Sequence, residues 1–338
     1  MKLFNGNGYP FFRTKRGITL LFIILLTSAI FGCLFGSTFI PLKDFIGGLL
    51  WQDGFHSQSV IIYYIRIPRV LAGLLAGIGL SISGVLLQTV TGNTLAGPNI
   101  IGVNAGAGFC CVVLLTFFPG SWAALPIVSF FGAFLTTLLI LAVAKRVNAS
   151  SGTVILAGIA CTALLNAGIS FLNLLDTDVL SSYNAFSVGG LRGVSTEQLV
   201  IPGAIIICCL IICLFLSGHI HLLSLGEPIA RSLGVNTKRI QMLALVCASA
   251  SAAAVVSYAG LLGFVGLVVP HIARRLCGST TAPLLVVSSL VGATIVILAD
   301  LFGRVILAPT EISVGILMAL IGAPFFFVLL LKRRNSYD

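Results

Sequence analysis

The sequence contains few charged residues and no long polar segment. Charged residues make up 8% of its 338 positions, whereas hydrophobic residues make up 58%. Soluble domains carry about 25% charged and roughly 45–50% apolar residues, so this composition excludes a water-soluble globule. We therefore predict an all-α, polytopic membrane protein, in which no polar interval is long enough to form a separate soluble domain.

The sequence also lacks the motifs of a nucleotide-binding or catalytic protein. No lysine completes a G-x-x-x-x-G-K-[ST] phosphate loop, so any ATP that drives the protein would bind to another chain. No nucleophile lies beside a general base, and His219 and His221 lack the additional ligands that a metal site needs. We therefore expect no catalytic residue, no metal and no cofactor in this chain.

The nine cysteines and the net charge of +10 both fit a membrane protein. All of the cysteines lie in or beside apolar runs, where they are expected to pack as small hydrophobic residues rather than form disulfides. The basic residues form short clusters between apolar runs instead of one continuous face. This distribution excludes nucleic-acid binding and is typical of cytoplasmic loops.

Apolar runs of the length that crosses a bilayer, about 17–25 residues, predict about ten spans. Residues 1–17 are polar and basic, and no A-x-A cleavage site follows the first run, so we interpret them as a cytoplasmic tail before an uncleaved helix. With alternating sides, most Lys and Arg residues fall on the inner side, which favours cytoplasmic termini. The predicted spans cover 18–36, 66–89, 99–118, 123–144, 153–173, 198–217, 239–258, 261–275, 282–304 and 312–331.

Three arginines fall at the predicted outer ends of spans. Arg66 and Arg69 flank a proline that favours the first turn of a helix, and their spacing directs both guanidinium groups to one side. They suit either snorkelling to the interface or docking of carboxylates on an external partner. Arg304 follows Asp300 by four residues, the spacing of an intrahelical ion pair, which suits a structural or a transport role.

Three connections between spans have features of their own. The outer loop 37–62 has a helix-start signal at Pro41, which suits a short surface helix. The uncharged inner break 88–99 would line a cavity or form a tight hairpin. The inner loop 218–238 predicts a short helix that begins near Pro228 and ends near Gly234. Its apolar side, formed by Ile229, Ala230 and Leu233, suits lipid headgroups or a groove on a partner.

Several motifs occur in order between residues 60 and 334: Arg66–Ala72, Ser83-Gly84, Leu87-Gln88, Asn93 with Leu95-Ala96, Gly102, Leu225–Glu227 with Ala230 and Leu233-Gly234, Gly263–Arg274, Ala299-Asp300 with Arg304, Glu311 with Val314-Gly315, and Gly322–Phe326. Together they resemble the motifs of the FecCD-type permeases, the family of the vitamin B12 and ferric-siderophore importers. Thr94, Gly92 and Pro228 depart from the residues usual in that family.

The resemblance implies a BtuC-like type II ABC importer permease fold, with residues 1–338 as a single transmembrane domain. It further implies that two permease copies, identical or paralogous, form a translocation pathway in the cytoplasmic membrane of a bacterium. Two cytoplasmic ABC ATPases would bind ATP and Mg²⁺, and an extracytoplasmic binding protein would deliver the cargo. The implied cargo is an iron(III)-siderophore chelate, although heme and cobalamin remain alternatives.

The resemblance also assigns roles to particular residues. Arg66, Arg69 and Arg304 match arginines that pair with glutamates on the binding protein. The inner gate would use Asn93 and Leu95, together with Ser150 and Ser151 in the loop between the fourth and fifth spans. The ATPases would be coupled through the loop 218–238, in particular Leu225, Gly226, Glu227, Ala230, Arg231, Leu233 and Gly234.

Three other classes of protein compete with the importer. A transporter driven by an ion gradient normally needs ionisable groups within the membrane, and this chain offers little beyond Asp300. An intramembrane enzyme would need a catalytic pair, which the spans lack. A membrane scaffold without transport would leave the family motifs unexplained.

Overall fold

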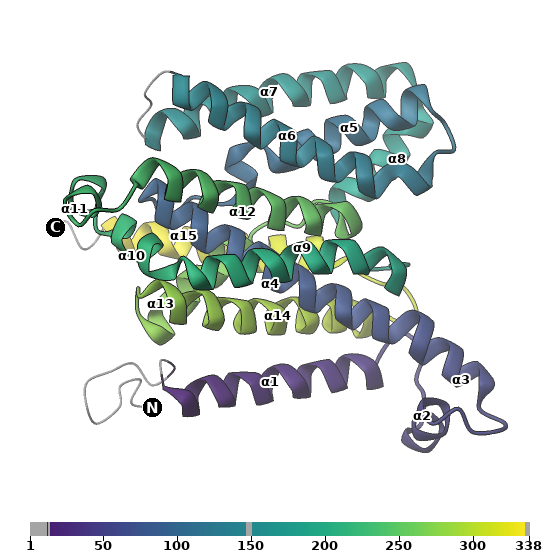
Figure 1. The fold of residues 1–338 in the computed structure, drawn as a ribbon. Helices are drawn as coiled ribbons and strands as arrows, with labels where there is room; N and C mark the ends of the chain where they lie inside the picture. Colours follow the sequence, from purple (N-terminus) through teal and green to yellow (C-terminus); the bar gives the residue numbers. More distant parts are fainter. Residues whose placement is uncertain (1–11, 13, 147–150, 335–338) are drawn as a thin grey trace.

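The computed structural model describes residues 12, 14–146 and 151–334, and this part of the chain contains helices and no strand. Its longer helices lie side by side in a bundle (Figure 1). Each predicted span overlaps one of them, which agrees with the predicted all-helical architecture. These helices are α1 (Lys15–Leu34), α4 (Ile67–Thr91), α5 (Val103–Phe117), α6 (Leu125–Arg146), α7 (Ser151–Leu175), α9 (Thr196–Phe215), α12 (Thr237–Ala259), α13 (Val265–Cys277), α14 (Thr281–Val305) and α15 (Val314–Arg334).

Among the described residues, 7 helices are long and apolar enough to cross a membrane, whereas α5 and the segment Val314–Val328 of α15 are shorter apolar helices. Helix α13 has only 13 residues. It begins after a partly buried irregular segment, residues 260–264, that ends at Phe264 with a φ of 62°. Irregular backbone at this depth is tolerated where protein surrounds it.

Shorter helices lie at the two ends of the bundle. At one end are α2 (Leu42–Leu49), α3 (His56–Ile61), the π-helix η2 (Ile62–Arg66), the 3-10 helix η4 (Trp122–Ala124) and α8 (Thr177–Val188). At the other are α10 (Ser217–Ser224) and α11 (Glu227–Ser232), while η3 (Pro98–Ile101) leads into α5. We call these the α2 end and the α11 end. The start of α1 and the end of α15 both lie at the α11 end (Figure 1).

Helix α4 forms the centre of the bundle, with α12, α13 and α14 against it. It is almost surrounded by protein because small residues let its neighbours approach closely. A Cβ atom at Gly84 would collide with the backbone of Gly266 on α13, and one at Gly77 would collide with the backbone of Gly292 on α14. The central position of α4 holds its first turn against the end of α14, where the charged site is built.

The peripheral helices expose their apolar side chains. In α1, α6, α7 and α9 only 22% to 28% of the most apolar stretch of 18 residues is buried. Large residues such as Phe171, Leu174 and Phe215 face outward. Soluble monomers rarely expose contiguous apolar surfaces of this extent. The exposed surface therefore fits lipid contact, as the composition predicts.

Candidate functional site

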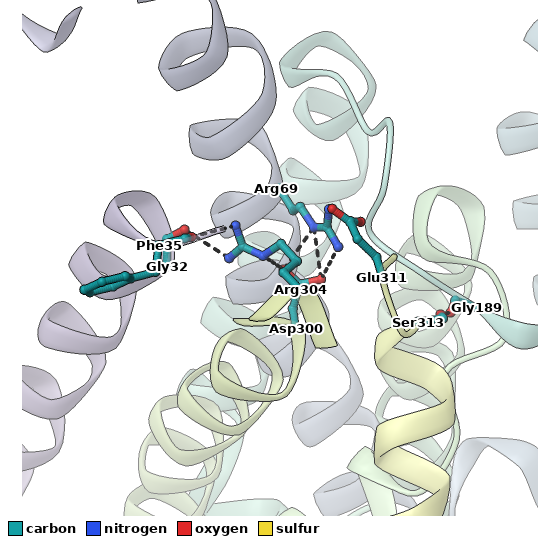
Figure 2. Close-up of polar contacts among 8 residues, drawn as sticks. All are labelled: Gly32, Phe35, Arg69, Gly189, Asp300, Arg304, Glu311 and Ser313. Atoms are coloured by element: carbon teal, nitrogen blue, oxygen red, sulfur yellow. Dashed lines mark hydrogen bonds and ion pairs between the residues drawn. The ribbon is translucent and has the colours of Figure 1, made fainter. Parts of the chain in front are cut away.

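The α2 end contains a cluster of charged residues, here called the arginine cluster: Arg66, Arg69, Asp300, Arg304 and Glu311. Arg69, in the first turn of α4, donates from Nε to both carboxylate oxygens of Asp300 at 3.0 Å. Its Nη2 also lies 3.0 Å from Asp300 Oδ1, and its Nη1 lies 2.8 Å from Glu311 Oε2 (Figure 2). One guanidinium thus joins α4 to α14 and to the loop that precedes α15.

Arg304 extends the cluster from α14 to α1. Its Nε lies 3.1 Å from Asp300 Oδ2, which confirms the intrahelical pair that the sequence predicts. Its Nη2 donates to the carbonyl oxygen of Gly32 at 3.0 Å, and its Nη1 donates to that of Phe35 at 3.2 Å (Figure 2). Asp300 is therefore shared between two arginines.

Arg66 completes the attachment of α1. Its Nη1 donates to the carbonyl oxygens of Cys33 and Leu34 at 2.8 and 2.5 Å, and its Nη2 donates to that of Thr38 at 2.7 Å. The last carbonyl groups of a helix have no partner within the helix. Arg66 and Arg304 together supply donors for the end of α1, which fixes this peripheral helix to the core.

All three arginines are buried. Arg66, Arg69 and Arg304 are 3%, 6% and 2% exposed, and Asp300 is 3% exposed. A buried charge is tolerated only where partners and hydrogen bonds compensate it, and here the compensation comes from the chain itself. The sequence interpretation placed these arginines at the outer surface, and beyond the pair of Arg304 with Asp300 it did not anticipate that their guanidinium groups would be bonded internally. Their docking role remains a prediction.

Glu311 is the more accessible carboxylate of the cluster, with 16% of its side chain exposed against 4% for Asp300. Partial burial alone would raise the pKa of Glu311. The hydrogen bond and charge of Arg69, a hydrogen bond from Ser37 and the charge of Arg192 outweigh burial and hold this pKa below its usual value. Glu311 is therefore ionised at neutral pH and neutralises part of the positive cluster.

At the opposite end, α11 forms as the sequence predicts. Gly226 precedes the helix with a φ of 111°, and Gly234 follows it with a φ of 80°, conformations that favour glycine. Glu227 Oε1 lies 2.5 Å from Arg231 Nη2 and accepts from Thr237 Oγ1 at 3.2 Å, which ties α11 to α12. The ion pair is exposed to solvent, unlike those of the arginine cluster.

The apolar residues of α11 divide into two groups. Leu225, Ile229 and Leu233 are exposed, whereas Ala230 is fully buried and accepts a backbone hydrogen bond from Val235. The sequence interpretation grouped Ala230 with Ile229 and Leu233 on one apolar side, and the structure corrects this because Ala230 faces the bundle. The exposed surface left for a partner is therefore the leucine and isoleucine set.

The predicted gate turn is a compact turn in which Asn93 and Leu95 are half-buried, while Gly92 and Thr94 are exposed. Asn93 Oδ1 accepts from the backbone nitrogen of Leu95 at 2.9 Å, and Gly92 adopts the left-handed conformation at the end of α4. Just beyond, Pro98 lies close enough to α13 that a Cβ atom at Gly266 would be 2.9 Å from its ring. Of the other two predicted gate residues, Ser151 begins α7, and Ser150 lies outside the described residues.

One polar contact near the gate turn was not assigned a role from the sequence. Arg274 Nη1 on α13 donates to Gln88 Oε1 near the end of α4 at 2.5 Å. Gln88 Nε2 in turn donates to the carbonyl oxygen of Leu267 at 3.4 Å. The only signal for this contact in the sequence is a glutamine inside an apolar run. Its partner is 186 residues away, so no local pattern identifies it.

The described residues contain no group of three or more His, Cys, Asp or Glu side chains that could hold a metal ion. Within the same part of the chain, no cysteine forms a disulfide, and five of the cysteines are buried. The two ends therefore differ: the α2 end holds a buried network of guanidinium and carboxylate groups, and the α11 end exposes apolar side chains.

Comparisons with known proteins agree with this arrangement. The model of the FecCD transport family matches residues 21–332. The chain is 35% identical over 319 residues to the Fe(3+)-citrate import system permease protein YfmE of Bacillus subtilis (strain 168), covering 94% of this chain and 95% of the relative. It is 33% identical over 297 residues to the vitamin B12 import system permease protein BtuC of Vibrio cholerae, covering 86% of this chain and 89% of the relative.

A solved structure shares the fold. It is an inward-facing conformation of a metal-chelate type ABC transporter, with a TM-score of 0.85 and 30% sequence identity. The superposition covers 94% of this chain and 100% of the other. The predicted fold class is therefore confirmed.

Proposed function

The chain belongs to the FecCD transport family and is a transmembrane permease subunit of an ABC importer, and we propose that its cargo is an iron(III)-siderophore chelate. The observation that carries this proposal is the match over 94% of the chain to a permease for ferric citrate, an iron chelate. The similarity to a vitamin B12 permease makes cobalamin the second candidate cargo. Hydrolysis of ATP belongs to a separate chain, as it does in these importers.

We further propose the usual assembly of such an importer. Two permease copies, identical or paralogous, would form the pathway, two ATPases carrying ATP and Mg²⁺ would bind at the α11 end, and a binding protein would dock at the α2 end. Clustered basic residues support a cytoplasmic α11 end, because Lys and Arg concentrate in cytoplasmic loops. They lie at the start of α1, at the start of α12, and at the ends of α13 and α15.

The α11 end has the features of a coupling surface. Ile229 projects from α11, and Leu225 and Leu233 flank it; the orientation of the helix is fixed by its glycine ends and by buried Ala230. An exposed apolar helix face of this kind suits insertion into a groove on a partner. We propose that this face, together with Gly226, Glu227, Arg231 and Gly234, transmits movement from the ATPases.

The α2 end would receive the binding protein through Arg66, Arg69 and Arg304. Because these guanidinium groups are bonded within the chain, docking would exchange internal acceptors for carboxylates of the partner. Glu311 is the acceptor best placed to be exchanged, since it is the more exposed carboxylate of the cluster. The gate would use Asn93, Leu95, Ser150 and Ser151 at the opposite end of the pathway.

Uptake into proteoliposomes tests the proposal directly. The vesicles contain the chain with its ATPase, the binding protein is added outside, and radiolabelled ferric citrate, ferric hydroxamates and cobalamin are compared. We expect accumulation of a ferric chelate that requires both enclosed ATP and the binding protein. Vesicles without ATP are the control. Accumulation driven by an ion gradient alone would contradict an ATP-driven importer, and accumulation of cobalamin alone would contradict the iron cargo.

A further inference from the structure

Helix α2 has an apolar face that nothing in the described chain covers. Leu42, Ile46, Leu49 and Leu50 are 64%, 49%, 39% and 62% exposed. At about 100° per residue these four side chains fall on one side of the helix. The opposite side carries Gly47 and Gly48, both of which are buried.

The glycine side of α2 is locked to α3, so the apolar face cannot turn inward. A Cβ atom at Gly47 would lie 2.7 Å from the Phe55 ring, and one at Gly48 would lie 2.8 Å from Cβ of Gln58. Ser59 Oγ donates to the carbonyl oxygen of Gly48 at 2.8 Å. Tyr63, in η2, donates to the carbonyl oxygen of Leu49 at the same distance. The hairpin of α2 and α3 is thus a single packed unit.

The position of α2 relates this face to the membrane-crossing helices. Figure 1 shows α2 nearly end-on while the long helices run across the view, so α2 lies crosswise to them at the end of the bundle. Exposed apolar residues also lie on either side of α2 along the chain, at Phe39 after α1 and at Tyr64 and Ile65 before α4. Helix α2 thus lies between two spans that also expose apolar side chains near this end.

Both tryptophans of the chain lie in connections that the fold places at the α2 end, and both are exposed: Trp51 directly follows α2, and Trp122 begins η4. Trp51 packs against Tyr63 with ring centroids 5.7 Å apart. Tryptophan and tyrosine are enriched where membrane spans meet water.

We propose that α2 is a membrane-surface anchor whose apolar face lies at the boundary between headgroups and acyl chains. Its exposed face is wholly apolar, whereas the surface of a soluble partner's docking site mixes polar and apolar residues. Exposed Lys43 borders the face, where its ammonium group reaches lipid phosphates. The inference requires only that the long apolar helices cross a bilayer, and it does not depend on the cargo.

Such an anchor sets the depth of the arginine cluster. The chain runs from α2 through α3 and η2 to Arg66 without an irregular break after His56. Because α2 is packed against this continuous helical segment, a fixed depth of α2 fixes the depth of Arg66 and of the α1 end that Arg66 holds. Lipid contact at α2 would then keep the charged cluster at the surface where an external protein meets it.

Single-tryptophan quenching in proteoliposomes tests the anchor. Trp51→Phe with Trp122→Phe gives a tryptophan-free background, into which Ile46→Trp is introduced. Asp53→Trp, in the exposed turn after α2, is the matched control in the same background. We expect the Ile46→Trp emission to be quenched most by lipids brominated high on the acyl chain, in line with a depth of about 5–10 Å. Aqueous iodide should quench the Asp53→Trp emission and spare the other.

Equal quenching of both variants by iodide, without quenching by brominated lipids, would overturn the anchor. The anchor would be equally overturned if Ile46→Trp became shielded from iodide only when a binding protein is added, because the face would then belong to that protein. If Ile46→Trp does not fold, Leu42→Trp on the same face, at a more exposed position, takes its place.

Discussion

The two ends of the molecule use the same pair of chemical groups in opposite ways. In the arginine cluster, Arg69, Arg304 and Asp300 have side chains that are only 3% to 7% exposed. On α11, Arg231 and Glu227 are 57% and 43% exposed. Breaking a buried pair leaves an uncompensated charge in a poorly solvated place, whereas an exposed pair is screened by water and salt. We therefore expect the α2 end to determine stability and the α11 end to remain available to a partner.

Replacing Asp300 should have the largest effect. Asp300→Ala leaves Arg69 and Arg304 without their shared carboxylate, and removal of one partner from a buried pair costs about 3–5 kcal/mol. We expect a corresponding loss in the free energy of unfolding, measured by denaturant titration in detergent. Asp53→Ala, at an exposed aspartate, is the control and should be neutral. A variant at position 300 as stable as the control would mean that the cluster is not buried as described.

Replacing Arg66 should have a smaller and more local effect. Arg66→Ala removes three hydrogen bonds from carbonyl groups at the end of α1, and leaving buried acceptors unsatisfied costs roughly 1–3 kcal/mol. Hydrogen exchange should rise around residues 33–38 and remain unchanged in α14. An equal increase of hydrogen exchange in both regions would argue against a specific attachment of α1 by this arginine.

The pH dependence of Glu311 should be smaller again. Its folded-state pKa is lowered below the unfolded value of about 4.3. A group with a lowered pKa contributes stability that is fully present above the unfolded pKa and is lost as the pH falls through the folded pKa. Wild-type stability should therefore decline below about pH 4.3 more steeply than that of Glu311→Gln. Parallel curves for the two proteins would show that Arg69 does not interact with this carboxylate.

The same contrast explains what could be predicted from the sequence. Hydropathy located the spans, and the spacing of Asp300 and Arg304 predicted their pair, because both signals are local along the chain. Helix α8 was not predicted, although Asp176 caps its first turn, because its polar residues give no membrane signal. The contact of Arg69 with Asp300 joins residues 231 positions apart. The burial of the arginines depends on such contacts, and no local pattern determines them.

The smallest effect on stability, and the sharpest on function, is expected at α11. Leu233→Asp places a charge on an exposed side chain, and surface substitutions usually change stability by no more than about 0.5 kcal/mol. If this face couples the ATPases, the variant should fold normally, insert normally and lose ATP-driven uptake in the proteoliposome assay. Ala230→Asp is the matched comparison one turn away, because it buries the same charge and should lose folded protein instead. Normal uptake by Leu233→Asp would remove the coupling role from α11, whereas equal loss of folded protein in both variants would mean that Leu233 is not on the surface.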